Sequence, residues 1–329
     1  MKILLICPFA NADAKAFVES LAQGLDSDIK LSDSGLNTLF LQQKKFDIVH
    51  FFLPATSKSP LGVPKKGSNT LVLQTIFNLP REPEAYRKVV FADRVVVFSE
   101  QESSAIRQQI PETAVHVIPP CNQSPSVTKL EPAAAIREKY DVQNRLLVIA
   151  LNDFCDQQHF TAFLYTVREY NRRGGFRFVI PLYRQDKQSI LWRNRLAEAI
   201  QKEKLHSTIL LNALVDVHSL IDAADFTLFM DKRPDRAFGF PLITVEALCA
   251  GKPVLCYNVP PVNEVVAAFR KDWIASVNED FSRMSRDLLK ETSRLEQIST
   301  ELARFARSKM SVDSVAQSYE QLYNPRLSL

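Results

Sequence analysis

Short apolar runs rich in β-branched residues alternate with amphipathic stretches along the whole chain, and this alternation narrows the choice of fold more than any other feature. Alternating strands and helices are typical of a parallel sheet covered by helices on both faces. In the first half, strands are predicted over residues 2–7, 47–53, 70–76, 94–98 and 115–118. In the second half, strands are predicted over residues 146–151, 176–180, 208–211, 226–229 and 254–257. The sequence therefore predicts two α/β domains, and 329 residues suffice for both.

A proline-rich passage between Ile118 and Pro132 separates the two sets of strands. Proline interrupts both helices and sheets, so this passage is predicted to be a linker. We expect a first domain, a linker and a second domain over residues 1–118, 119–134 and 135–310. Within the first domain, Ser99 and Glu102 have the spacing of a capping box, which predicts that a helix begins there.

Composition argues against several classes of protein. The chain has 8 glycines and neither a GxGxxG nor a GxxxxGK[ST] motif, so neither a nicotinamide dehydrogenase nor a P-loop ATPase is indicated. A phosphate group would have to be held by helix ends and side chains. The formal net charge of +4 is compatible with a phosphorylated ligand and does not require nucleic acid as a partner. Five scattered cysteines without CxxC spacing, and the lack of an apolar run of about 20 residues, predict a protein of the reducing cytoplasm.

The segment from Phe238 to Val254 has the pattern of a turn, a helix and a buried strand in direct succession. Pro241 suits the first position of the helix, and Gly251 suits the position just after its end. The start of such a helix favours phosphate, because it presents free N–H groups and the positive end of the helix dipole. Glu246, one turn later, can accept hydrogen bonds from two ribose hydroxyls. The alternative is an ordinary helix–strand unit with a solvent-facing glutamate.

This segment resembles the donor-site signature of retaining glycosyltransferases of the GT-B fold, of the family 4 type. Further similar segments are Phe46–His50, Ala92–Glu100, Val115–Pro119, Asp225–Phe229, Pro253–Tyr257, Val262–Val266 and Met310–Tyr323. The resemblance implies the GT-B architecture, in which two Rossmann-like domains face a cleft and a C-terminal helix, here in residues 311–329, crosses back to the first domain. It also implies transfer of a sugar from a nucleoside diphosphate to a hydroxyl group with retention, and no metal or other cofactor.

The resemblance also implies which residues of the second domain bind the nucleotide-sugar. Glu246 corresponds to the second glutamate of the family signature and would hold the ribose. The diphosphate would be held at the start of the same helix, by Phe240, Pro241 and Leu242. Glu264, in the next similar segment, is also included among the donor-binding residues.

The chain departs from the family pattern at three donor-site positions. The first glutamate of the signature is replaced by Phe238. The family's arginine position falls on Asn152 or Asp153, and its lysine position falls on Gln158, so neither position is positively charged. A carboxylate at Asp153 would repel a diphosphate at close range. These losses favour a second hypothesis, in which the protein is a catalytically silent GT-B scaffold that binds a partner or a sugar-containing ligand.

A longer loop before the signature helix offers replacements for the missing cations. Its basic residues are Lys232, Arg233 and Arg236. Arginine binds phosphate through two parallel hydrogen bonds, so Arg233 or Arg236 could take over from the missing pair. The alternative is a solvated surface loop.

In the first domain, the residues expected to face the ligand follow the first predicted strand or lie in the second. They are Asn11, Lys15 and His50. Lys15 could reach a phosphate near the start of the first helix, and His50 matches a histidine of the family. The alternative for His50 is a purely structural hydrogen bond, because a single histidine at a strand end is usually explained in that way.

The expected partners are a nucleotide-sugar and an acceptor that is a glycan or a lipid-linked molecule, as is common in the family. Peripheral contact with the inner face of a membrane is compatible with Lys58, Lys65 and Lys66 in one polar loop, although a solvated loop explains them equally. The scaffold hypothesis would instead require a protein or sugar-containing partner. A sugar-phosphate epimerase related to GT-B enzymes is a third hypothesis, which no individual residue favours.

Overall fold

The computed structural model describes residues 1–8, 12–32, 46–54, 70–80, 82–121, 131–142, 145–151, 157–182, 187–214, 216–232 and 240–324. The chain forms two compact units, and each is described separately. Unit 1 consists of Met1–Ser124, Arg233–Val245 and Arg307–Leu329. Unit 2 consists of Pro125–Lys232 and Glu246–Ala306.

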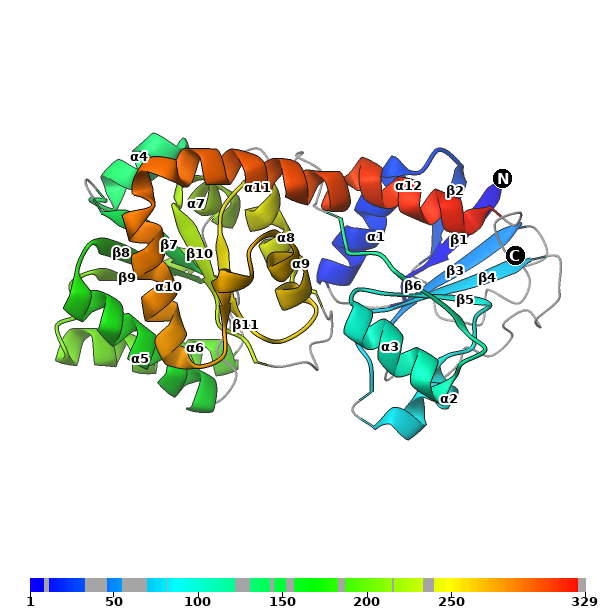
Figure 1. Cartoon of the computed structure of the whole chain (residues 1–329), viewed down its shortest axis with the longest axis horizontal. Helices are drawn as coiled ribbons and strands as arrows, with labels where there is room; N and C mark the ends of the chain where they lie inside the picture. Colours follow the sequence, from blue (N-terminus) through cyan, green and yellow to red (C-terminus); the bar gives the residue numbers. More distant parts are fainter. Residues whose placement is uncertain are drawn as a thin grey trace. The chain divides into compact units, whose positions relative to one another are not determined.

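Unit 1 is built on a six-stranded parallel sheet with the order β2-β1-β3-β4-β5-β6 (Figure 1). The strands are β1 (Lys2–Ile6), β2 (Asp28–Ser32), β3 (Ile48–Leu53), β4 (Leu71–Ile76), β5 (Arg94–Val97) and β6 (Ala114–Val117). The five predicted strands of this half are confirmed, whereas β2 was not predicted. It lies at the edge of the sheet, is mostly exposed and carries Asp28 and Lys30, so its apolar pattern is weak.

The helices of unit 1 in the described ranges are α1 (Ala12–Gly24), α2 (Tyr86–Val89, preceded by the 3₁₀ turn η3, Pro83–Ala85), α3 (Glu100–Gln109) and α12 (Val312–Tyr323). The Ser99 hydroxyl accepts a hydrogen bond from the Glu102 N–H at 3.1 Å, which confirms the predicted start of α3. The last helix, α12, packs against α1 (Figure 1). Gly24 permits this approach, because a Cβ atom there would lie 2.6 Å from Cγ1 of Val312.

Unit 2 contains a second six-stranded parallel sheet with the order β12-β11-β10-β7-β8-β9. Its strands are β7 (Leu146–Ala150), β8 (Phe176–Leu182), β9 (Thr208–Leu214), β10 (Phe226–Phe229), β11 (Val254–Tyr257) and β12 (Ile274–Ala275). The five predicted strands are again confirmed, and the edge strand β12 was missed because two residues are too few to show a period. Strand order reverses between β7 and β10, since the chain adds β8 and β9 on one side and β10, β11 and β12 on the other.

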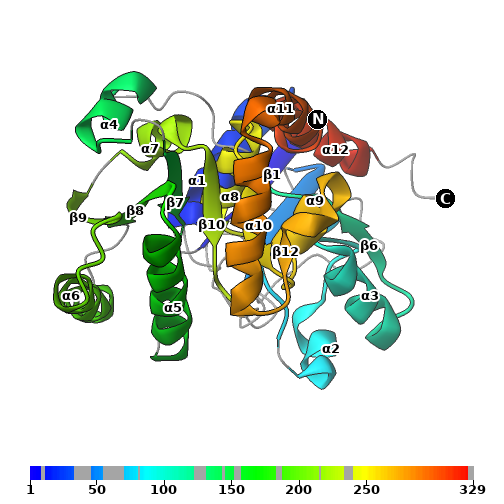
Figure 2. The ribbon, with the colours of Figure 1, turned by 60° about the vertical axis from the view of Figure 1, so that its left-hand side comes forward.

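The helices of unit 2 connect these strands. They are α4 (Ala133–Lys139), α5 (Gln157–Arg173), α6 (Lys187–Lys202), α7 (Val217–Ala223), α8 (Leu242–Cys249), α9 (Val262–Phe269), α10 (Asn278–Lys290) and α11 (Leu295–Met310), with the 3₁₀ turns η4 (Lys271–Trp273) and η5 (Thr292–Arg294). Residues 242–245 of α8 and 307–310 of α11 belong to unit 1. Parallel strands are joined by right-handed crossovers, so the reversal of strand order puts α5 and α6 on one face and α7, α8 and α9 on the other. The chain then returns, and α10 packs beside α5 (Figure 2). None of the helices in the described ranges combines the length and the apolar character needed to cross a bilayer.

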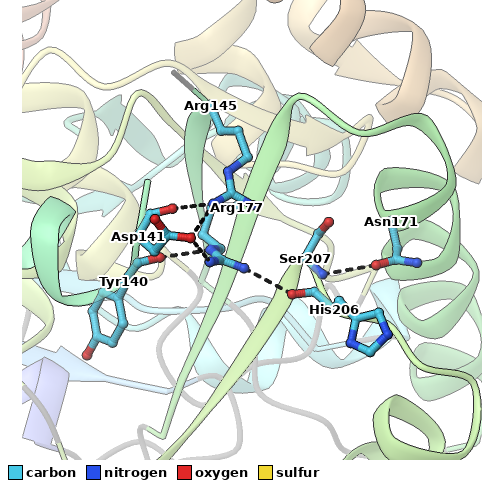
Figure 3. A network of polar contacts seen from close by, with 7 residues as sticks. All are labelled: Tyr140, Asp141, Arg145, Asn171, Arg177, His206 and Ser207. Atoms are coloured by element: carbon cyan, nitrogen blue, oxygen red, sulfur yellow. Dashed lines mark hydrogen bonds and ion pairs between the residues drawn. The ribbon is translucent and has the colours of Figure 1, made fainter. Parts of the chain in front are cut away.

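A polar network ties together the amino-terminal edge of the unit 2 sheet (Figure 3). The Arg177 guanidinium donates to the carbonyl oxygens of Tyr140 at 2.8 Å and His206 at 3.0 Å, and to the Asp141 carboxylate at 2.9 Å. Arg145 donates to the same carboxylate at 2.7 Å. One arginine on β8 therefore fixes the chain segments that lead into β7 and β9.

Candidate functional site

The strand order of the unit 2 sheet reverses between β7 and β10. Open parallel sheets bind ligands at such a reversal, beyond the carboxyl ends of the strands. Asp231 lies two residues after the end of β10, and its side chain is only 2% exposed. Nε2 of His159, in the first turn of α5, lies 3.7 Å from Oδ1 of Asp231. A buried carboxylate is costly without a partner, and the His159 ring nitrogen is a polar group close to it at the strand reversal.

Lys232 is held at the same edge by an aromatic ring. Its Nζ lies 4.1 Å from the ring centroid of Tyr257, the last residue of β11. The Tyr257 hydroxyl donates a hydrogen bond to the Asn278 side chain, and burial raises the pKa of this phenol, so that it stays neutral. A cation over an aromatic face gains about 0.5–2 kcal/mol, which orients the lysine without neutralising its charge.

Glu246 lies near the middle of α8, and its side chain is 19% exposed. Its Oε1 atom is hydrogen-bonded to Nδ1 of His218, in the first turn of α7. The helices α7 and α8 follow β9 and β10, so both begin on the carboxyl side of the sheet. The carboxylate predicted to bind ribose is thus accessible and held in one place.

The start of α8 differs slightly from the prediction. The helix begins at Leu242, so Pro241 immediately precedes it, and the Pro241 carbonyl accepts the Thr244 N–H at 2.9 Å. The side chains of Phe240, Pro241 and Leu242 are buried, and the Phe240 ring packs edge-on against Phe98 with centroids 6.5 Å apart. Any contribution of these three residues to anion binding would therefore come from the backbone.

The remaining predicted residues of the second domain have less distinctive surroundings. Gln158 is exposed in the first turn of α5, and Glu264 is partly buried in the first turn of α9. The predictions for Asn152, Arg233 and Arg236 fall outside the described residues. The described residues contain no group of three His, Cys, Asp or Glu side chains arranged to hold a metal ion.

In unit 1, the predicted residues have separate surroundings. Lys15 is exposed on α1, with its Nζ 3.9 Å from a carboxylate oxygen of Glu19. His50 on β3 is completely buried, and its ring nitrogens contact the Tyr323 hydroxyl and the Thr75 hydroxyl, each at 2.8 Å. His50 is therefore a buried side chain with structural hydrogen bonds, which is the alternative considered above. In this conformation the ring cannot touch a ligand. Asn11 and the loop lysines at 58, 65 and 66 lie outside the described residues.

Three side chains of this region were not among the predicted site residues, namely His159, His218 and Asp231. Two features of the sequence draw attention to Asp231 and His218. Asp231 ends an apolar strand with a charge, and Asp216 two residues before His218 is a helix-capping residue type. Neither signal identifies the partner of each side chain, because the partner lies on a different helix or strand.

Comparison with known proteins agrees with this architecture. Residues 191–304, most of which lie in unit 2, match the sequence family described as Glycosyl transferases group 1. The structure of a glycosyltransferase from Rickettsia africae ESF-5 superposes with a TM-score of 0.75 at 15% identity, covering 99% of this chain and 98% of that chain. No curated protein matches the chain in sequence.

Two further structures similar to this chain are complexes of Anabaena Alr3699/HepE. The complex with UDP has a TM-score of 0.72 at 15% identity, and the complex with UDP-glucose has a TM-score of 0.69 at 16% identity. Each covers 98% of this chain and 99% of that chain. At such identities the likeness establishes the fold, so the chain has the two-domain α/β fold of GT-B glycosyltransferases.

Proposed function

We propose that the protein is a glycosyltransferase that moves a sugar, with retention, from a nucleoside diphosphate to an acceptor hydroxyl. The observation that carries this proposal is the accessible Glu246 carboxylate on α8, within the segment that matches the glycosyltransferase family. A carboxylate in this position suits the vicinal hydroxyls of a ribose, because it accepts two hydrogen bonds at once. Similar structures bound to UDP and UDP-glucose make uridine diphosphate the first nucleotide to test.

In the proposed reaction, the bond between the anomeric carbon and the diphosphate breaks, and a bond to the acceptor oxygen forms on the same face of the sugar. The acceptor proton passes to the departing diphosphate. Negative charge grows on that diphosphate, so positive groups fixed near it lower the barrier. We propose that Lys232 supplies this charge, with Arg233 and Arg236 adding to it.

The acceptor is proposed to be a glycan or a lipid-linked molecule that the protein meets in the cytoplasm or at the inner face of a membrane. The net charge of +4 is compatible with an anionic surface of that kind. No metal or other cofactor is required by the proposed chemistry, since fixed side-chain cations provide the stabilisation.

A catalytically silent scaffold is the second candidate function. One observation favours it, which is that Gln158, at the position of the family's lysine, is exposed and uncharged. Such a protein would bind a nucleotide or a sugar-containing partner and would release no diphosphate from a nucleotide-sugar.

The first test is thermal unfolding in the presence of UDP, GDP and ADP. A ligand at 100 times its dissociation constant should stabilise the native state by about 2.7 kcal/mol. The shift should disappear in Glu246→Ala and persist in Glu296→Ala, which removes an exposed glutamate from α11. Arg233→Ala tests whether the loop contributes to diphosphate binding.

Turnover separates the two candidate functions. Release of the nucleoside diphosphate from a nucleotide-sugar would establish the transferase, and binding without any release would favour the scaffold. The absence of any nucleotide shift in the unmodified protein would contradict the proposed donor site.

A further inference from the structure

The His218–Glu246 pair gives the proposed nucleotide site a specific selectivity, and this inference rests on the proposed function. We propose that His218 is a positioning residue that fixes the Glu246 carboxylate for the ribose, so that the site selects ribonucleotides over 2′-deoxyribonucleotides. The pair joins two helices through Nδ1 of His218 and Oε1 of Glu246.

His218 is itself held in place by the capping of α7. Asp216 is the N-cap residue, and its Oδ1 accepts the backbone N–H of His218 at 3.0 Å. Its other carboxylate oxygen accepts a hydrogen bond from the Ser219 hydroxyl, and that hydroxyl in turn accepts the Glu131 N–H at 3.3 Å. Both carboxylate oxygens of Asp216 therefore accept hydrogen bonds from this turn. The turn is rigid, and it presents the His218 imidazole to α8.

The hydrogen bond from His218 orders the Glu246 side chain, so the nucleotide does not have to order it on binding. A glutamate side chain on a helix surface samples several rotamers, and holding it in one of them costs conformational entropy. In this protein the carboxylate is oriented before the ligand arrives. Groups that are preorganised in this way bind more tightly because the ligand does not have to order them.

A carboxylate held by one donor can still receive both hydroxyls of a ribose. Its two oxygens together offer about four lone-pair positions, and His218 occupies one of them. The side chains of His218 and Glu246 are 26% and 19% exposed, so a ligand can reach the pair. A 2′-deoxyribose leaves one of the remaining positions empty in a partly desolvated site, which penalises its binding.

The choice of ring nitrogen gives a sharp test. Because Nδ1 faces Glu246, asparagine at this position keeps a donor nitrogen at nearly the same distance from the backbone, whereas glutamine places its amide near the position of Nε2. His218→Asn should therefore behave like the unmodified protein, and His218→Gln should behave like His218→Ala. His206, an exposed histidine at the other edge of the same sheet, provides the matched control His206→Ala.

The experiment measures, by calorimetry, the dissociation constants of UDP and 2′-deoxy-UDP, or of the corresponding pair for whichever nucleotide binds best. We expect the unmodified protein, His218→Asn and His206→Ala to prefer the ribonucleotide by about tenfold or more. Glu246→Ala, His218→Ala and His218→Gln should lose most of this preference, chiefly by weaker binding of the ribonucleotide. If His218→Ala or Glu246→Ala does not fold, the comparison of His218→Asn with His218→Gln still tests whether His218 positions the carboxylate.

Two outcomes separate the inference from the function on which it rests. If the nucleotide binds and Glu246→Ala weakens it, but His218→Ala and His218→Gln keep the full preference for ribose, the inference is wrong and the proposed function stands. If no nucleotide binds the unmodified protein, the proposed donor site itself is wrong, and the selectivity proposal is overturned with it.

Discussion

Gly251 ends α8 in a conformation that few other residues tolerate. Its φ is +77°, the Gly251 N–H donates to the Leu248 carbonyl at 2.9 Å, and the Lys252 N–H donates to the Ala247 carbonyl at 2.8 Å. This is the Schellman pattern of a glycine-terminated helix. The prediction that Gly251 follows the end of this helix is confirmed.

Replacement of Gly251 by alanine should destabilise unit 2 by on the order of 1–3 kcal/mol from backbone strain alone. A Cβ atom would also overlap the backbone oxygen of Ser299 on α11, which adds a steric clash. Gly174→Ala is the matched control, because Gly174 has a φ of +70° and a Cβ atom added there would meet no other atom within 4 Å. Urea unfolding of both variants should show the larger loss for Gly251→Ala; equal losses would mean that α11 moves aside freely.

At the scale of the elements, the Arg177 guanidinium on β8 holds together the segments that precede β7 and β9 (Figure 3). Its side chain is 13% exposed and donates to three acceptors on separate residues. Lysine has the charge but not the planar fork, so Arg177→Lys should lose some of these hydrogen bonds from a charged donor and cost about 1–3 kcal/mol.

Urea unfolding followed by tryptophan fluorescence can measure this loss, because both tryptophans, Trp192 and Trp273, lie in unit 2. Arg172→Lys serves as the control. Arg172 is 67% exposed and pairs with Glu169 at 2.8 Å, and a surface pair of this kind contributes about 0–1 kcal/mol. An Arg177→Lys variant as stable as Arg172→Lys would show that the network does not hold the edge together.

For the molecule as a whole, the stability of unit 1 should depend on pH through His50. Its burial lowers the pKa of the imidazole from 6.5 to about 3, beneath α12 and between the hydroxyls of Thr75 and Tyr323. The unfolded chain binds a proton below pH 6.5, whereas the folded protein does not until near pH 3. The contribution is therefore complete above pH 6.5 and is lost as the pH falls, by about 1.4 kcal/mol per unit.

Between pH 7 and pH 5 this difference amounts to about 2 kcal/mol of unfolding free energy. Hydrogen exchange of the β3 and β4 amides, corrected for intrinsic rates, reports unit 1 separately, and His50→Gln should remove the extra pH dependence. The lowered pKa of His116 is common to both proteins and cancels in the comparison. Identical pH dependence in the two proteins would contradict a neutral, buried His50.

Much of the fold could be predicted from local patterns. All strands in the described ranges except β2 and β12 follow from apolar periodicity, and so does the helix that carries Glu246. The end of that helix at a glycine follows from the stop residues, which act over a few neighbours. The edge strands β2 and β12 could not be predicted, because one is polar and exposed and the other has two residues. Both are strands only because an adjacent strand offers hydrogen bonds.

The candidate site could likewise be predicted only in part. Glu246 is recognisable in the sequence, since its helix and the family signature lie in one continuous segment. Its partner His218 is 28 residues away, and the phenol that contacts the buried His50 is 273 residues away. Periodicity determines which face of each element is apolar, but the order of strands in a sheet determines which elements become neighbours. The alternation of strands and helices thus follows from the residues alone, whereas the pairing of side chains on separate helices exists only after the sheet has been assembled.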